Sequence, residues 1–317
     1  AKGFTFNETG KLVRDEKVKS ATTLDLSNCN LSDISGLEVF PNLTDINLSN
    51  NKFYYSFDFS KLPETVTGID LTGNEIYEYP GLVNIETEEN GDETVTVQRK
   101  LTKLLLPESA KYNCDELVYF YEQNPNADMK MENANGILEA YTTLRNVPDA
   151  ITLSSLQNLF PSLFKGDQID ISRRIITPSE KTQNIVVGGE YPGFDGYGVE
   201  EMEGVEYVAM NRGWTGASIV ICSTGECRLP YLKLKNTVKI LSTLNISTPN
   251  LDISQAIYLL SVTLRNNAEL DNLDLTNCIE FGQRGRDIEL DLANGSSIRL
   301  SSCENLKTIK LPSKSRI

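Results

Sequence analysis

The segments Leu24–Leu31 (LDLSNCNL), Ile46–Phe53 (INLSNNKF) and Ile69–Ile76 (IDLTGNEI) carry one pattern three times. Their first residues are 22 and 23 positions apart. In each segment two aliphatic residues alternate with polar ones, and a period of two is typical of a short strand with one buried face. The pattern therefore predicts three short strands, one in each of three successive coils of the chain.

A turn is expected directly after each strand, at Cys29, Asn51 and Asn74. Such a turn hides backbone groups that need hydrogen-bond partners. An Asn side chain supplies both a donor and an acceptor, and Cys can fill the same space as a small apolar residue. We therefore predict that this position is buried and ties each turn to its surroundings.

This pattern resembles the leucine-rich repeat, whose consensus is L-x-x-L-x-L-x-x-N/C-x-L with a period of about 20–29 residues. One coil of such a repeat cannot bury its own apolar face, so coils stack on one another. The resemblance implies an α/β repeat solenoid. This would be a right-handed superhelix of mainly short parallel strands, with some helices on its convex side and an inserted hairpin.

The same pattern suggests how the chain is divided. Residues 1–23 are expected to cap the first coil, and residues 24–112 to hold repeats that a hairpin at 83–98 interrupts. Residues 113–217 read as degenerate repeats with helices and a long loop rich in Gly and aromatic residues. Residues 218–317 read as short coils, and we expect all four parts to form one continuous solenoid.

Local spacing predicts further elements in the middle of the chain. Apolar residues in Leu117–Tyr121 predict a helix that ends before Pro125, and the spacing of Ile137, Leu138, Tyr141 and Leu144 predicts a second helix. The ITL run at 151–153 and the IDI run at 169–171 each predict a strand of the repeat.

Strands of the form I/L-x-I/L recur every 7 to 15 residues from Ser218 onward. Two strands per coil are therefore expected, and taking alternate strands gives coil starts at 219, 244, 262, 288 and 309. The last stretch, IRLSSCENLKTIKLP, resembles the BspA-type leucine-rich repeat of bacterial surface proteins. The residues that carry this resemblance are Cys303, Leu306, Ile309, Leu311 and Pro312.

The BspA-type resemblance implies an extracellular place at a bacterial cell surface, and a role in adhesion through contact with a protein or a glycan. An outer-membrane lipoprotein with a lipid anchor upstream of Ala1 would fit this expectation. A structural or scaffold subunit of a larger surface assembly is the alternative, and we expect the chain itself to be a monomer.

The composition argues against several classes of function. The formal net charge of −14 argues against binding to nucleic acid, which requires basic patches. No run of about 18 apolar residues is present, so we expect no membrane span. Histidine, the commonest general base and metal ligand, is absent from the chain. We therefore expect a non-catalytic protein without a cofactor or a metal.

Two of the six cysteines, Cys222 and Cys227, lie in the short motif CSTGEC. A disulfide between them could close a small loop. A metal site is one alternative, but the second pair of ligands that such a site needs is missing. Unpaired thiols are the other alternative.

Two groups of side chains are candidates for binding a partner. Residues that alternate with the buried ones point to the outer face of the stacked strands and form a polar ladder of Asp25, Ser27, Asn47, Ser49, Asp70 and Thr72. The Gly-rich stretch and the GW pair after it carry Tyr191, Phe194, Tyr197 and Trp214. These rings could stack on sugars, or they could anchor a long loop to the solenoid.

Overall fold

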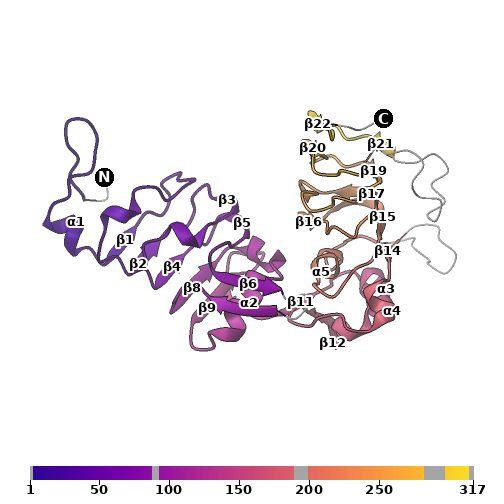
Figure 1. Cartoon of the computed structure of the whole chain (residues 1–317), viewed down its shortest axis with the longest axis horizontal. Helices are drawn as coiled ribbons and strands as arrows, with labels where there is room; N and C mark the ends of the chain where they lie inside the picture. The colour runs from indigo at the N-terminus through magenta and orange to yellow at the C-terminus, as the bar shows by residue number, and fades with distance from the viewer. Residues whose placement is uncertain (1–2, 88–92, 189–198, 282–296, 314–317) are drawn as a thin grey trace. The chain divides into compact units, whose positions relative to one another are not determined.

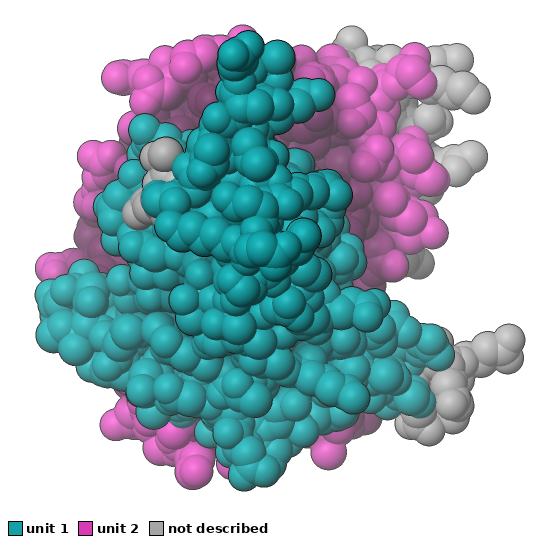
Figure 2. Space-filling view, turned by 90° about the vertical axis from the view of Figure 1, so that its left-hand side faces the viewer, with its two compact units in different colours: residues 1–142 teal, residues 143–317 magenta. Residues whose placement is uncertain are grey.

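The computed structural model describes residues 3–87, 93–188, 199–281 and 297–313 (Figure 1). The chain divides into two compact units, Ala1–Thr142 and Thr143–Ile317, which Figure 2 colours separately. Both units consist mainly of short strands with few helices, which fits a repeat α/β fold.

Unit 1 contains one sheet of six strands. From β1 to β9 all neighbours are parallel, and only the last strand, β10, is antiparallel to its neighbour. In sheet order the strands are β1 (Thr23–Asp25), β2 (Asp45–Asn47), β4 (Gly68–Asp70), β8 (Lys103–Leu106), β9 (Asp128–Glu132) and β10 (Leu138–Ala140). Parallel pairing at this spacing requires each strand to be followed by a return of the chain, as the repeat predicts.

The predicted segments are in register. Leu24 lies beside Ile46, Ile46 beside Ile69, and the row continues through Leu104 and Met129, which gives steps of 22, 23, 35 and 25 residues. The ladder extends past the strand ends, because Leu26 N–H donates to the carbonyl of Asn47 and Leu48 N–H to that of Asp70, both at 2.8 Å. The stacking of the three predicted segments is therefore confirmed.

Of the three predicted turn residues, Asn51 is buried and holds its turn as the sequence predicts, whereas Cys29 and Asn74 are half-buried. Asn51 accepts hydrogen bonds from the N–H groups of Cys29 and Leu31, each at 3.0 Å. Its amide nitrogen donates to the carbonyls of Leu26 and Leu48, both at 2.8 Å. One buried side chain therefore satisfies backbone groups of two successive coils.

A left-handed residue precedes this position in each coil. Asn28, Asn50 and Gly73 all have positive φ, between 52° and 65°. Asn and Gly are the residues that adopt this conformation at least cost. The same feature recurs in unit 2, at Asn245, Asn266 and Ser302.

The remaining elements of unit 1 lie around this sheet. The short helix α1 (Glu16–Ser20) begins at Asp15, whose carboxylate accepts from Val18 N–H at 3.0 Å. The predicted hairpin is present as the antiparallel pair β6 (Val83–Thr87) and β7 (Glu93–Val97). The others are β3 (Tyr54–Ser56), which pairs with β5 (Glu75–Glu78), the 3-10 helices Leu37–Val39, Phe59–Lys61 and Glu108–Tyr112, and α2 (Glu116–Gln123).

Two local predictions are wrong. The expected helix around Ile137–Leu144 is instead the strand β10 followed by β11 (Leu144–Asn146). Asn133 accepts hydrogen bonds from the N–H groups of Asn135 and Ile137, and this side chain holds a turn where a helix would need helical bonds. The expected strand at 151–153 is the start of a helix, because Asp149 caps it by accepting from Ile151 N–H and Thr152 N–H.

Unit 2 begins with a small antiparallel sheet. The strand expected at 169–171 is found as β13, but it pairs antiparallel with both of its neighbours and so does not continue a parallel repeat. The elements of this part are β11, β12 (Phe164–Lys165), β13 (Gln168–Asp170), α3 (Ala150–Leu159), the 3-10 helix Pro161–Leu163, α4 (Pro178–Lys181) and α5 (Val205–Met210).

The rest of unit 2 is made of parallel strands in two rows, as expected for two strands per coil. The first row is β14 (Ile185–Val187), β15 (Ser218–Arg228), β17 (Ile240–Ser247), β19 (Ser261–Arg265) and β21 (Ser297–Ser301). The second row holds two separate pairs, β16 (Tyr231–Lys233) with β18 (Asn250–Asp252) and β20 (Asn272–Asp274) with β22 (Thr308–Lys310).

The predicted coil starts need two corrections, at 244, because Leu244 pairs with Cys222 and not with Ile219, and at the end of the series. Ile219 pairs with Leu241, Leu241 with Val262, and Val262 with Ile298. Residue 309 belongs to the other row, where Ile309 pairs with Leu273. Residue 288 lies outside the described residues, and the step of 36 residues from Val262 to Ile298 explains why alternation by counting failed there.

Candidate functional site

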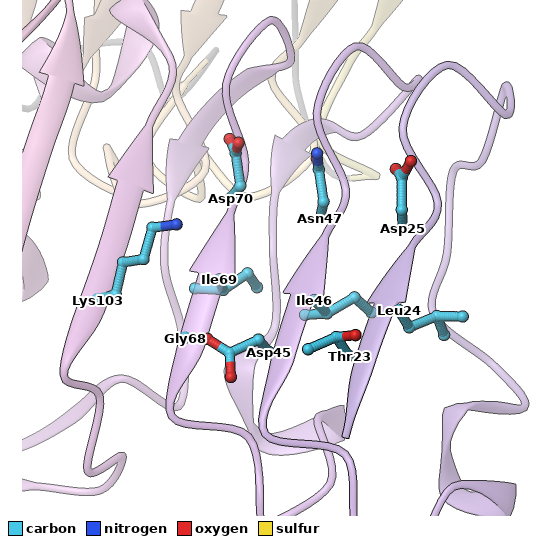
Figure 3. A pocket seen from close by; sticks show the side chains of 10 residues that line it. All are labelled: Thr23, Leu24, Asp25, Asp45, Ile46, Asn47, Gly68, Ile69, Asp70 and Lys103. Atoms are coloured by element: carbon cyan, nitrogen blue, oxygen red, sulfur yellow. The ribbon is translucent and has the colours of Figure 1, made fainter. Parts of the chain in front are cut away.

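A pocket of about 200 Å³ lies on the strand face of unit 1 (Figure 3). We call it the strand-face pocket. It spans the four parallel strands β1, β2, β4 and β8, and its lining residues are Thr23, Leu24, Asp25, Asp45, Ile46, Asn47, Gly68, Ile69, Asp70 and Lys103.

Two rows of side chains cross these strands. Asp25, Asn47 and Asp70 are register partners, and Figure 3 shows them side by side at the ends of their strands. The second row lies two residues earlier in each strand and consists of Thr23, Asp45, Gly68 and Lys103. Since side chains alternate along a strand, both rows belong to the same face of the sheet.

Gly68 makes a recess in the second row. A Cβ atom built on Gly68 would collide with Oδ1 of Asp45, so the carboxylate of Asp45 leans across β4 into the space that the glycine leaves. Gly68 is not among the residues with positive φ, so the backbone conformation does not require a glycine. The position of Asp45 in the pocket therefore depends on the missing side chain of Gly68.

Half of the predicted polar ladder lines this pocket, and the other half supports it. Asp25 Oδ1 accepts from Ser27 N–H, and Asn47 Oδ1 accepts from Ser49 N–H, both at 2.9 Å. Asp70 Oδ1 accepts from the N–H and the hydroxyl of Thr72, at 3.0 and 2.7 Å. Ser27, Ser49 and Thr72 thus lie in the turns beyond the pocket and orient its residues.

The same side-chain turn occurs in unit 2, away from this pocket. Asp170, Asp252 and Asp274 each accept from the N–H two residues later in the chain. At Asp274 the hydrogen bond from the Thr276 hydroxyl, together with Lys310, lowers the pKa of the carboxyl to about 2. The aspartate that ends a strand therefore has a structural role in every such coil, whether or not it also binds a partner.

The sequence prediction missed three polar or glycine positions, Asp45, Gly68 and Lys103. The alternation that selected Asp25, Asn47 and Asp70 also applies two residues earlier, so it could have found Asp45 and Gly68. Lys103 was harder to place, because the step from Ile69 to Leu104 is 35 residues long and hides the register.

The strand-face pocket has an acidic character. Its lining contains three carboxylates, Asp25, Asp45 and Asp70, and one ammonium group, Lys103. The whole chain is also acidic, with a formal net charge of −14. A positively charged side chain of a partner would therefore find a favourable potential here.

A larger hollow of about 390 Å³ lies on the turns of the first coils, but its carboxylates are engaged in local structure. Asp33 accepts from Ser35 N–H, and Asp58 accepts from the N–H and hydroxyl of Ser60. The hydrogen bond from the Ser60 hydroxyl lowers the pKa of Asp58. Its lining residues are Ser32, Asp33, Ile34, Ser35, Phe53, Ser56, Phe57, Asp58, Lys61 and Pro80.

The position of Trp214 argues against the aromatic sugar-binding surface that the sequence offered as one alternative. Tyr191, Phe194 and Tyr197 lie outside the described residues. Trp214 is 1% exposed, and its indole N–H donates to the carbonyl of Gln183 at 2.6 Å. Its ring packs in the core of unit 2 and presents no face on which a sugar could stack.

Cys222 and Cys227 both lie on β15, and both are free thiols in the structure. Of the alternatives left open by the sequence, the structure therefore has the unpaired thiols and not the disulfide. Burial raises the pKa of the Cys227 thiol to about 11 and also raises that of Cys222. The pairing of β15 with β17 shifts register between Cys222 and Cys227. Such an irregularity explains how the CSTGEC segment fits into the strand without a disulfide.

The described residues were also searched for two other kinds of site. No three Cys, Asp or Glu side chains among them come together in a group that could hold a metal ion. Within the same ranges, no helix has the length and apolar character needed to cross a membrane.

Comparison with known families agrees with the geometry of the first coils. Residues 22–55 match the family described as leucine-rich repeats, in two copies. No curated protein matches the chain. The matched residues include β1, β2 and the turns at Cys29 and Asn51. Residues 22–55 are therefore similar to leucine-rich repeats, and the two strands within them, β1 and β2, form one side of the strand-face pocket.

Proposed function

We propose that the protein is a non-catalytic binding protein and that it holds a partner protein on the strand face of unit 1. Leucine-rich repeats generally mediate protein binding. Repeat proteins commonly use the surface formed by their stacked strands for this purpose. The observation that carries the proposal is the acidic pocket over Gly68, which lies on this face.

The partner segment that suits this pocket carries arginine or lysine. Asp45 projects across Gly68, and Asp70 stands on the same strand two residues later, so carboxylates approach the recess from two strands. An arginine is favoured over a lysine, because its planar guanidinium can bond two carboxylates at once.

Selection of peptides from a display library against the full chain tests this proposal. Peptides that bind the wild type should be enriched in arginine and lysine, and Asp45→Lys should weaken their binding about tenfold, since it replaces an attraction by a repulsion. The matched control is Asp271→Lys, an exposed aspartate of unit 2 whose replacement gives the same net charge. Equal losses of affinity in both variants would show that only the overall charge matters, and would refute the strand-face pocket as the binding site.

We further propose that each parallel ladder is the strand face of a right-handed superhelix, and that the protein works outside the cell at a bacterial surface, in adhesion. The resemblance of the last coil to BspA-type repeats supports the location. Labelling of intact cells with a reagent that does not cross membranes tests it: an unlabelled protein in intact cells that becomes labelled after lysis would contradict a surface location.

A further inference from the structure

The lining of the strand-face pocket includes one positive side chain, Lys103 of β8, and three carboxylates. Figure 3 shows Lys103 at one flank of the pocket and Asp25 at the other. Lys103 is exposed, and in the described part of the chain its ammonium group forms no ion pair. A lysine that lines an acidic pocket without pairing with any of its carboxylates calls for a physical reason.

The order of the strands gives the first part of this reason. β4 lies between β2, which carries Asp45, and β8, which carries Lys103. Neighbouring strands lie about 4.8 Å apart, so the backbones that carry these two charges are separated by roughly 10 Å. The residue of β4 between them is Gly68, which has no side chain to fill the gap. The recess at Gly68 therefore separates an acidic from a basic group.

The other neighbour of Lys103 gives the second part. Asp128 of β9 is its register partner on the side away from the pocket. The carboxylate of Asp128 is already engaged, because Lys130 Nζ lies 3.0 Å from its Oδ1 and 3.2 Å from its Oδ2. Charges on β9 thus neutralise each other, and Lys103 keeps its charge for an anionic group from outside the chain.

The two carboxylates beside the recess each keep one oxygen for a ligand. Asp45 Oδ2 accepts from the hydroxyl of Thr44 at 2.8 Å, and Asp70 Oδ1 accepts from the N–H and the hydroxyl of Thr72. Among the described residues no hydrogen bond is donated to Asp45 Oδ1 or to Asp70 Oδ2. Asp45 Oδ1 is the atom that occupies the space over Gly68. The recess thus offers two anionic oxygens, and the next strand offers one ammonium group.

This arrangement sets the spacing of the charges in a ligand. Its positive group belongs over β4 and its negative group over β8, one strand spacing of about 4.8 Å away. In an extended segment, residues two positions apart point to the same side and are about 6.6 Å apart. The length of an arginine or glutamate side chain accommodates the difference. A segment that crosses the strands and carries an arginine and an acidic residue two positions apart therefore fits.

A second copy of the chain fits the pocket less well. A two-fold contact could place Asp45 of one copy beside Lys103 of the other. It would also bring two pockets together that each carry three carboxylates and one ammonium group. The formal net charge of −14 on each chain adds to this repulsion.

We propose that Lys103 makes the strand-face pocket selective for a partner segment that carries both charges. The guanidinium of its arginine lies over Gly68 between Asp45 and Asp70, and an acidic side chain two positions away pairs with Lys103. This inference rests on the proposed function of the pocket and adds the second charge that the partner must carry.

Parallel selections from one peptide display library, against the full-length wild type and Lys103→Glu, test this inference. Peptides selected by the wild type should carry Asp or Glu two positions from their arginine. Peptides selected by Lys103→Glu should keep this arginine and carry Lys or Arg at the second position. The matched control is Lys100→Glu, which changes the charge equally at an exposed lysine outside the pocket and should select the same peptides as the wild type.

Affinities of one peptide selected by the wild type give the second readout. In fluorescence anisotropy, Lys103→Glu should weaken its binding about tenfold, and Lys100→Glu by less than about twofold. A peptide whose acidic residue is replaced by lysine should bind the wild type about tenfold more weakly and should regain affinity with Lys103→Glu. Circular dichroism checks that each variant is folded.

The possible failures can be told apart. If the wild type and Lys103→Glu select the same arginine-containing peptides without a preferred acidic position, this inference is overturned and the proposed function stands. If the wild type enriches neither arginine nor lysine, both are overturned. Sedimentation that shows a wild-type dimer which Lys103→Glu abolishes would assign the pocket to a second copy, and this result too would overturn the inference.

Discussion

At the scale of single residues, Asn51 shows why the repeat needs an amide in its turn. Its side chain bonds to backbone groups on both sides, in the coil of β1 and in its own coil. Cys29, at the same position in the coil of β1, offers a thiol, which contacts the carbonyl of Ser27 at 3.3 Å.

Replacement of Asn51 by alanine should lower the free energy of unfolding of unit 1 by about 3 kcal/mol, because buried N–H and C=O groups lose their partners. Urea unfolding followed by circular dichroism measures this change. Asn28→Gly is the control, since glycine keeps the positive φ at that position and should change the stability by only a few tenths of a kcal/mol. A loss as small as that of the control would contradict the assigned role of Asn51.

The low pKa of Asp274 predicts an effect of pH on stability. The carboxyl has a pKa of about 2 in the folded protein against 3.8 as its ordinary value, so its ionised form stabilises the fold above pH 4. This contribution is lost as the pH falls from 4 to 2. The difference in unfolding midpoint between wild type and Asp274→Asn should therefore be constant above about pH 5 and shrink toward pH 2. A difference that does not change over this range would contradict the shift.

At the scale of elements, the sequence predicts strands well where aliphatic residues recur in register, and it also predicts the helix α2 at Leu117–Tyr121, but it fails at two other short runs. Leu24, Ile46 and Ile69 are paired as expected. The predictions for 137–144 and 151–153 were wrong because a single polar side chain determines the local structure in each case. Asn133 holds a turn before the first run, and Asp149 caps a helix that includes the second. Apolar spacing carries no information on such side-chain bonds.

The residues of the candidate site could also be predicted only in part. Asp25, Asn47 and Asp70 follow from alternation along strands whose register the repeat sets. The recess at Gly68 could not be predicted, since it depends on the side chain of Asp45 lying across the neighbouring strand. The sequence left two interpretations of Trp214 open, because an aromatic residue beside glycine gives the same pattern whether its ring is buried or exposed, and its burial removes the sugar-binding one.

Close packing between two segments of unit 2 predicts a sensitive glycine. A Cβ atom on Gly213 would collide with the backbone of Ile175, which cannot move as a flexible side chain would. Gly213→Ala should therefore destabilise unit 2 by about 3 kcal/mol. Gly225→Ala is the matched control, because nothing lies within 4 Å of its added atom. Thermal unfolding of both variants tests this, and equal melting temperatures would contradict the packing.

At the scale of the whole molecule, the proposed binding surface shares the acidic character of the chain. The strand-face pocket of unit 1 is lined by three carboxylates and one ammonium group, and the formal net charge of the chain is −14. A basic partner segment would therefore be attracted both by the pocket and by the chain as a whole. The scaffold alternative drawn from the sequence would instead require an exposed apolar patch.

This acidic character predicts a response to salt. Binding of an arginine-rich peptide to unit 1 should weaken strongly when NaCl is raised from about 0.05 to 0.5 M, because exposed charges are screened beyond a few ångströms. Titrations at both salt concentrations measure this response, and an affinity that does not change with salt would contradict the electrostatic role of the strand-face pocket.

The long steps in both ladders have a practical consequence. Between Ile69 and Leu104, between Ile185 and Ile219 and between Val262 and Ile298 the chain spends 35, 34 and 36 residues, where the other coils of the same ladders use 21 to 25. The strands on either side of each long step still pair in register. The protein thus already accommodates long insertions at three points. A foreign epitope inserted between β6 and β7 should therefore leave the pairing of the flanking parallel strands intact, and the protein could serve as a scaffold for antigen display.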